Sequence, residues 1–144
     1  MENKILHVED NPDDITLTAL AFRKAGVKAV LEVAPDGERA MAILKDAAAL
    51  EQLACVLLDV KLPSVSGLEV LAWLRGIPAL KRLPVIMLTS SLLPGDINRA
   101  YDLGANSYLV KPPDLDSLIG LAKTIDLYWL QTNTRPMAQP ATGL

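Results

Sequence analysis

The chain has 144 residues, 51% of them hydrophobic, and a formal net charge of −3. This length and composition suit one domain with a substantial core, and the small negative charge argues against a surface that binds nucleic acid. No apolar stretch is long and uncharged enough to span a bilayer or to form a signal peptide, so a cytoplasmic protein is expected, with Cys55 as a small core residue.

Short apolar runs and helix-like segments alternate along the chain. The first helix is predicted to begin at Asn11-Pro12, with acidic residues in its first turn, and to end before Gly26. The complete prediction, in chain order, is strand 4–8, helix 12–25, strand 27–34, helix 38–48, strand 55–58, helix 68–75, strand 84–88, helix 94–104, strand 107–110 and helix 114–130. Residues 131–144 are predicted to form a flexible tail, which leaves 1–130 as the folded domain.

Five strands that each precede a helix predict an α/β fold with a parallel sheet covered on both faces. Right-handed crossovers make this a doubly wound sheet, in which ligands bind beyond the carboxyl ends of the strands. Glu9 and Asp10 follow the first strand, Asp59 the third, Thr89 the fourth and Lys111 the fifth. These residues are therefore expected to meet at one edge of the sheet.

Taken together, these residues suit phosphoryl transfer. Neighbouring carboxylates repel one another, and a divalent cation such as Mg²⁺ relieves that repulsion. Beside the cation, one carboxylate can act as a nucleophile on a phosphoryl group, while a lysine and a threonine bind its oxygens. Each residue alone has an ordinary explanation: the acids favour a helix N-terminus or a turn, and Thr89 and Lys111 lie at the surface. His7 is expected to be a core residue.

Short motifs occur along the chain in an order and spacing typical of one family. They are Val8-Glu9-Asp10, Leu57-Leu58-Asp59, Leu62-Pro63 with Gly67, Met87-Leu88-Thr89-Ser90 and Tyr108-Leu109-Val110-Lys111-Pro112. Over about residues 3–128, the chain resembles the receiver domains of bacterial two-component response regulators. The resemblance implies a flavodoxin-like, five-stranded sheet with the order 2-1-3-4-5, and a phosphorylation-driven switch that serves signal transduction.

The resemblance implies which residues bind the metal and the phosphoryl group. Asp59 would accept the phosphoryl group from a histidine kinase. Asp10 and Asp59 would bind Mg²⁺ directly, Glu9 would bind it through water, and the backbone carbonyl of Lys61 would complete the protein ligands. The long cationic side chain of Lys61 leaves the lifetime of the phosphorylated form undetermined.

The same resemblance implies how the switch is built. Thr89 would be the switch hydroxyl, and Tyr108 would be the aromatic residue that changes rotamer with it. Lys111 would contact the acyl phosphate. The Lys111–Pro112 peptide bond would be cis, a state that proline makes accessible.

A narrower resemblance concerns the partner kinase. The Asn11-Pro12-Asp13-Asp14 start, the 78–84 segment and the Tyr128-Trp129-Leu130 end are similar to single-domain regulators that partner phytochrome-type histidine kinases. Two adjacent aromatic residues on one helix cannot both be buried on the same face. They predict a downstream partner contact or a homodimer that also uses 94–104 and 107–110, and a tail that folds back over them is the equal alternative.

Other functions stay open from the sequence. The domain could pass its phosphoryl group onward in a phosphorelay, or bind partners without being phosphorylated. A haloacid-type aspartyl phosphatase would need a second aspartate two residues after the nucleophile, where this chain has Lys61. A flavin-binding domain would need a phosphate-binding loop after the first strand. No small-molecule turnover is therefore expected, and the sequence does not name the cognate kinase, the downstream target or the oligomeric state.

Overall fold

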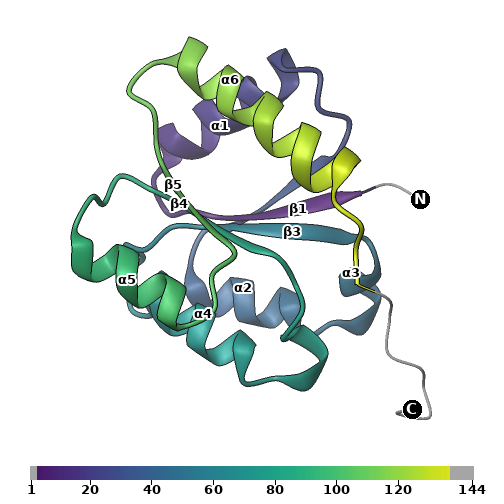
Figure 1. Cartoon of the computed structure of the whole chain (residues 1–144), viewed down its shortest axis with the longest axis vertical. Coiled ribbons are helices and arrows are strands. Elements are labelled where there is room, and N and C mark those ends of the chain that lie inside the picture. The colour runs from purple at the N-terminus through teal and green to yellow at the C-terminus, as the bar shows by residue number, and fades with distance from the viewer. Residues whose placement is uncertain (1–2, 137–144) are drawn as a thin grey trace.

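The computed structural model describes residues 3–136, which contain one parallel sheet. The strands lie in the order β2-β1-β3-β4-β5. Their bounds are β1 Lys4–Val8, β2 Val30–Ala34, β3 Leu53–Leu58, β4 Val85–Thr89 and β5 Ser107–Val110. Helices cover both faces of this sheet (Figure 1), which confirms the predicted doubly wound, flavodoxin-like α/β fold.

The helices form two layers, one on each face of the sheet (Figure 1). One face carries α1 (Pro12–Lys24) and α6 (Leu115–Ile125), and the other carries α2 (Gly37–Leu44), α4 (Gly67–Arg75) and α5 (Pro94–Asp102). The shorter elements are α3 (Ala47–Glu51), a 3-10 turn η1 (Pro78–Leu80) and a π-helical segment η2 (Asp126–Thr132). Within residues 3–136, no helix is long and apolar enough to cross a membrane.

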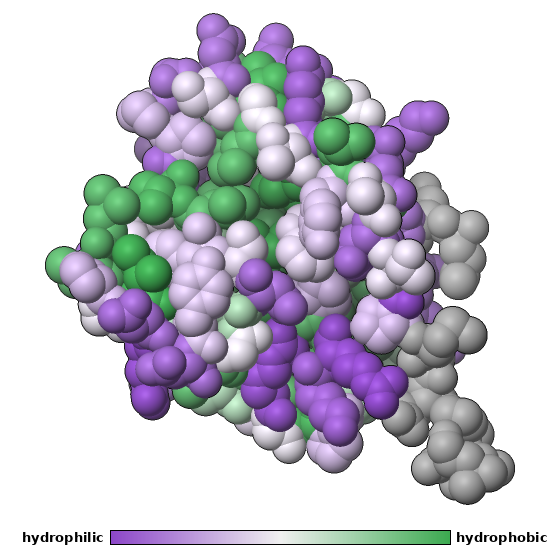
Figure 2. All heavy atoms as spheres, in the orientation of Figure 1, coloured by the Kyte–Doolittle hydropathy of each residue, from purple (hydrophilic) through white to green (hydrophobic). Residues whose placement is uncertain are grey.

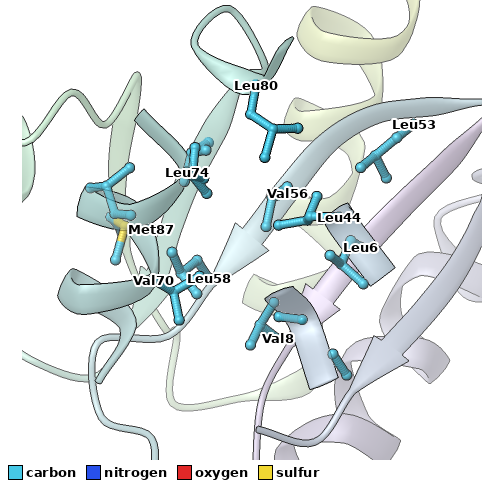
Figure 3. Close-up of a cluster of buried hydrophobic side chains, with 14 of the residues drawn as sticks. Leu6, Val8, Leu44, Leu53, Val56, Leu58, Val70, Leu74, Leu80 and Met87 are labelled. Atoms are coloured by element: carbon cyan, nitrogen blue, oxygen red, sulfur yellow. The ribbon is translucent and has the colours of Figure 1, made fainter. Parts of the chain in front are cut away.

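Alternate residues of the central strands point to opposite helix layers. Leu6 and Val8 of β1 join the core beneath α2 and α4, whereas Ile5 joins the core beneath α1 and α6. Figure 3 shows the first of these clusters, where strand residues meet Leu44 of α2 and Leu74 of α4. Burial on both faces explains why the central strands are continuous apolar runs in the sequence, and it holds their carboxyl ends in fixed places.

Several predicted bounds differ from the structure by one or two residues, and two predicted elements, those at 27–34 and 38–48, differ by more. The strand predicted at 27–34 begins at Val30, because β2 is an edge strand paired with β1, and Val30 lies opposite Lys4, the first residue of that partner. The helix predicted at 38–48 is split into α2 and α3, because Asp46 caps a new helix by accepting a hydrogen bond from the Ala48 amide (3.0 Å). Neither difference moves a predicted site residue.

The C-terminal helix continues slightly beyond its predicted end. α6 changes into η2, which ends at Thr132. The Thr132 hydroxyl donates to the Leu127 carbonyl (2.6 Å), five residues earlier along this π-helical segment. Beyond η2, the Arg135 guanidinium donates to the side-chain oxygen of Asn3 (2.8 Å). The rest of the predicted tail, residues 137–144, lies outside the described residues.

One arginine joins three segments on the α4 side of the sheet. The Arg75 guanidinium donates to the Gly104 carbonyl from Nε (3.0 Å) and Nη2 (2.8 Å), and to the side-chain oxygen of Asn106 (2.9 Å). Its Nη1 donates to the carbonyls of Leu80 (3.2 Å) and Leu83 (2.8 Å). The guanidinium thereby links the end of α4, the end of η1 with the segment after it, and the turn between α5 and β5.

Gly67 determines how closely the start of α4 approaches the end of β3. Its amide donates to the Val60 carbonyl (2.9 Å). A Cβ at this position would lie 1.8 Å from the carbonyl oxygen of Asp59, a distance that no side chain tolerates. The loop after Asp59 can therefore return tightly onto the strand end because residue 67 has no side chain.

We expect Gly67→Ala to destabilise the protein by about 2–4 kcal/mol, because the new Cβ would displace the backbone of Asp59. Urea unfolding followed by circular dichroism measures the free energy of unfolding. Gly120→Ala on α6 is the control, since nothing lies within 4 Å of its Cβ position and alanine favours a helix. Equal stability of Gly67→Ala and the wild type would contradict this account.

Candidate functional site

The predicted site residues lie at the ends of the strands. The backbone amides of Glu9, Asp59 and Lys111 each donate to a carbonyl of the neighbouring strand, at 3.0, 3.2 and 2.9 Å. The hydrogen-bond ladder of the sheet thus extends just beyond β1, β3 and β5. Asp10 follows Glu9, and Thr89 is the last residue of β4. The structure brings these residues together at the carboxyl edge of the sheet, where a doubly wound fold binds its ligands.

Glu9, Asp10 and Asp59 form an acidic cluster. One carboxylate oxygen from each of them lies within 4.8 Å of the others. Glu9 and Asp59 are buried, at 1% and 6% exposure, whereas Asp10 is exposed. Carboxylate oxygens at this spacing suit a divalent cation, and the exposed Asp10 gives it a route from solvent. The Lys61 amide donates to the Asp59 carboxylate (3.2 Å), and a metal contact from its carbonyl stays a prediction.

The Lys111 ammonium lies among the acids. Its Nζ donates to Glu9 Oε1 at 2.5 Å, to Asp14 Oδ2 at 2.8 Å and to Asp59 Oδ2 at 2.9 Å. An ammonium group has three N–H donors, so each donor has a carboxylate partner. The lysine side chain is 15% exposed, which makes these charge-assisted bonds largely desolvated. Lys111 thus offsets part of the negative charge that the buried acids create.

The two buried acids differ in protonation. Burial raises the pKa of Glu9 to about 7, although Lys111 donates to it at a short distance. Burial acts on Asp59 in the same direction, but hydrogen bonds from Lys111 and Thr89 outweigh it and lower the pKa of Asp59 below its usual range. Burial also opposes the charge of Lys111, yet hydrogen bonds to Asp14, Glu9 and Asp59 raise its pKa above the usual range. Asp59 is therefore an ionised carboxylate at neutral pH.

Thr89 and Tyr108 connect the site to the loop before α5. Thr89 is fully buried, and its Oγ1 accepts a hydrogen bond from the Ser91 amide (3.3 Å). The Tyr108 hydroxyl donates to the Ser91 carbonyl (2.9 Å), and the Ser91 hydroxyl donates to Asp96 Oδ2 (2.6 Å) in the first turn of α5. Sequence patterns do not identify Ser91 or Asp96, because their part in this chain of contacts depends on the path of the loop.

Asp14 is a site residue that the sequence analysis missed. It lies in the first turn of α1, where the Asn11 side chain accepts a hydrogen bond from its amide (3.1 Å), and an acid there is explained by the helix N-terminus alone. The signal that separates it from Asp13 is spacing. Asp14 lies four residues before Thr18, which is buried, so both belong to the helix face that is turned toward the sheet.

The expectation of a cis bond between Lys111 and Pro112 is wrong. No cis peptide bond occurs within residues 3–136. Trans is the lower-energy state even for a bond that precedes proline. In this trans form, the Lys111 side chain already reaches all of its carboxylate partners.

His7 is a core residue beneath the site. It is 1% exposed, and its Nδ1 has no hydrogen-bond partner among the described residues. Burial, and then the charge of Lys111, lower the pKa of His7 to about 4. The imidazole is therefore neutral near pH 7 and adds no positive charge to the site.

Comparison with known proteins identifies the family. The profile of the response regulator receiver domain matches residues 5–123. The chain belongs to the response regulator receiver family. Response regulator Rcp1 of Synechocystis sp. is 36% identical over 137 residues, which cover 93% of each protein. The probable methanogenesis regulatory protein FilR2 of Methanothrix harundinacea is 37% identical over 134 residues, or 92% of this chain and 86% of that protein.

Solved structures agree with this assignment. The phosphorylated cyanobacterial phytochrome response regulator RcpA is 38% identical and has a TM-score of 0.86, with 95% of this chain and 100% of that chain covered. The Mn²⁺-bound form of Rcp1 is 35% identical and has a TM-score of 0.81, with 94% and 99% covered. The chain is therefore a phosphorylation-dependent response regulator, in a family whose members include a metal-bound structure.

We expect Glu9 to make the metal-free protein less stable as the pH rises from about 4.5 to about 7. The folded protein holds the Glu9 proton more tightly than the unfolded chain does, so a rising pH favours the unfolded chain. Glu9→Gln stays neutral and should exceed the wild type in free energy of unfolding at about pH 8, by on the order of 2 kcal/mol. Urea unfolding in the presence of a chelator measures this difference.

The comparison must be made between the variant and the wild type, because His7 acts in the opposite sense. The pKa of His7 in the folded protein is about 4, below its usual 6.5. The contribution of His7 to stability is therefore fully present above pH 6.5 and is lost as the pH falls from there toward about 4. The difference between Glu9→Gln and the wild type cancels this term. A difference that stays constant from about pH 4.5 to about pH 8 would contradict a raised pKa at Glu9.

Proposed function

We propose that Asp59 accepts a phosphoryl group from a histidine kinase, with Mg²⁺ bound at the acidic cluster. The observation that carries this proposal is the contact between the Lys111 ammonium and Asp59 (2.9 Å), beside Glu9 and Asp10. A buried, ionised carboxylate held by a lysine is suited to act as a nucleophile next to a positive charge. Similarity to the phosphorylated regulator RcpA supports this function. A cytoplasmic location, expected from the sequence, is part of the same proposal.

In the proposed reaction, a carboxylate oxygen of Asp59 attacks the phosphorus of a phosphohistidine. The bond from phosphorus to the histidine nitrogen breaks as the bond to Asp59 forms, and its electron pair stays on that nitrogen. Asp10 and Asp59 would bind the cation directly, and Glu9 would bind it through water. Lys111 and Thr89 would bind oxygens of the phosphoryl group. The cation would supply charge neutralisation for the acids and the phosphoryl oxygens.

The added charge would then reach the loop before α5. The phosphoryl group would draw the Thr89 hydroxyl toward itself and away from the Ser91 amide. Because Ser91 is also bonded to Tyr108 and Asp96, the loop and the start of α5 would move together. A partner that prefers one arrangement would distinguish the two states by a coupling free energy of about 1–3 kcal/mol.

Phosphotransfer from a radiolabelled histidine kinase should label the wild type and leave Asp59→Asn unlabelled, because an amide cannot act as the nucleophile. Removal of Mg²⁺ with a chelator should prevent labelling of the wild type. Asp102→Asn is the matched control, since Asp102 is an exposed acid near the end of α5 and is not part of the acidic cluster. Equal labelling of Asp59→Asn and the wild type would refute the proposal.

The other functions that the sequence left open have less support. The chain lacks the second acid that an aspartyl phosphatase needs, because that position is occupied by Lys61, whose side chain is exposed. Onward transfer in a phosphorelay shares the step at Asp59, and it would appear in the same assay as label that moves to a second histidine protein. Steady hydrolysis of a small phosphate ester would instead favour the phosphatase.

The donor is proposed to be a phytochrome-type histidine kinase. Rcp1 and RcpA match this chain over nearly its whole length, and RcpA is a phytochrome response regulator. FilR2 matches at a similar identity, so the test must compare kinases of different sensor types. A phytochrome-type kinase should label Asp59 faster than a kinase with an unrelated sensor, and equal rates would remove this part of the proposal.

An apolar patch on the α5 side is the proposed contact surface for a second copy of the chain. We define the α5 patch by its four exposed members, Leu92 (68%), Leu93 (60%), Tyr101 (50%) and Val110 (38%). Hydrophobic residues gather at the left of Figure 2, where Figure 1 draws the loop before α5. Exposed apolar side chains next to the switch loop favour association. Tyr128 of η2 is 50% exposed as well, as the sequence indicated for the aromatic end.

We expect phosphorylation to raise the fraction of homodimer, because it moves the loop that carries Leu92 and Leu93. Light scattering before and after phosphorylation measures the molar mass in solution. The double variant Leu92→Ser/Leu93→Ser should stay monomeric in both states while Asp59 is still labelled, since the acids and Lys111 are unchanged. A wild type that is monomeric in both states would rule the dimer out.

A further inference from the structure

Lys111 binds carboxylates with two different roles. Two of its partners, Glu9 and Asp59, belong to the acidic cluster, whereas the third, Asp14, stands outside it. We propose that Asp14 is a positioning residue that holds the Lys111 ammonium when Glu9 and Asp59 turn to the cation and the phosphoryl group. The inference rests on the proposed function, in which Lys111 contacts the acyl phosphate.

The position of Asp14 is fixed by the backbone. The Asn11 side chain accepts hydrogen bonds from the amides of Asp13 (2.9 Å) and Asp14 (3.1 Å), which anchors the first turn of α1. From this turn, Asp14 Oδ2 reaches Lys111 Nζ at 2.8 Å. The contact joins α1 to the residue after β5, two parts of the chain that are far apart in sequence. Asp14 is 36% exposed, so it keeps a hydrated carboxylate outside the buried cluster.

The count of donors shows why a third acid matters. In the structure, all three N–H donors of Lys111 have carboxylate partners, which leaves no donor for an oxygen of the phosphoryl group. Phosphorylation converts the Asp59 carboxylate into an acyl phosphate, and Glu9 turns to the water that it shares with the bound cation. Two donors of Lys111 then become free for the phosphoryl oxygens, while the bond to Asp14 keeps the ammonium at the site.

A small cavity lies beside the contact between Asp14 and Lys111. It has a volume of about 60 Å³ and lies between α1 and the start of α6, with Asp14, Thr18, Lys111, Pro113 and Leu118 among its lining residues. None of its lining residues belongs to the acidic cluster, so the cavity gives the contact between Asp14 and Lys111 space to adjust on the side away from Asp59.

Asp13 provides a matched control for Asp14. Both acids lie in the first turn of α1, and both favour the helix N-terminus. Asp13 is exposed, whereas Asp14 is the one that Lys111 contacts. Asp13→Asn and Asp14→Asn change the net charge equally, so any difference between them reports on the contact with Lys111.

The first measurement is the affinity of the unphosphorylated protein for Mg²⁺, by isothermal titration calorimetry. Without Asp14, Lys111 would bind Glu9 and Asp59 alone and would compete with the cation for their oxygens. We expect Asp14→Asn to weaken Mg²⁺ binding about three- to tenfold, and Asp13→Asn to change it less than about twofold.

The second measurement is the signal of the Lys111 ammonium in heteronuclear NMR spectra. The signal is assigned to Lys111 because it should be missing from the spectrum of the Lys111→Arg variant. An ammonium that is held by hydrogen bonds exchanges its protons slowly with water and remains visible. With Mg²⁺ bound, we expect this signal in the wild type and Asp13→Asn, and its loss in Asp14→Asn. Asp14→Glu should restore the signal, because its longer side chain can still reach Nζ.

The outcomes separate this inference from the proposed function. Equal Mg²⁺ affinity and equal Lys111 signals in Asp13→Asn and Asp14→Asn would overturn the role of Asp14. A wild type that no histidine kinase phosphorylates would refute the proposed function instead. Both measurements use unphosphorylated protein, so they would still decide whether Asp14 holds Lys111.

Discussion

Burial of carboxylates at the ends of two central strands is the constraint on which the rest of the structure depends. Glu9 and Asp59 are buried side by side, so their carboxylates repel each other, and burial removes the water that would screen their charge. Lys111 compensates this charge from the end of β5, through a side chain that is itself desolvated. Its position follows from the pairing of β5 with β4, which continues into a bond between the Lys111 amide and the Thr89 carbonyl. The strand order therefore determines which residue compensates the charge of the buried acids.

The parts that follow from backbone topology could be predicted from the sequence. Buried parallel strands are short apolar runs between turn residues, and the predicted bounds of β1 and β5 agree with the structure at both ends. The residue after each run must lie at the carboxyl edge of the sheet. The sequence alone therefore predicts that Glu9, Asp59 and Lys111 lie together.

The sequence does not predict the features that depend on how far a side chain reaches, or on which of two local backbone conformations forms. The spacing to Thr18 separates Asp14 from Asp13 by helix face, but only the orientation of α1 relative to the end of β5 places Asp14 against Lys111. The break before α3 depends on whether the Asp46 side chain caps a new helix or remains within a longer one. The isomer of the bond before Pro112 is set by its surroundings, because the intrinsic preference is small.

Arg75 gives α5 two unequal ends. Its guanidinium grips the Gly104 carbonyl and the Asn106 side chain, just past the last turn of the helix. The first turn is tied through Asp96 to Ser91, next to the buried hydroxyl that faces the acids. A displacement of that hydroxyl would therefore move the first turn of α5 more than its last turn, which Arg75 anchors to α4. The surface next to Leu92 and Leu93 would therefore change with the state of the site, while the turn after α5 would keep its contacts with Arg75.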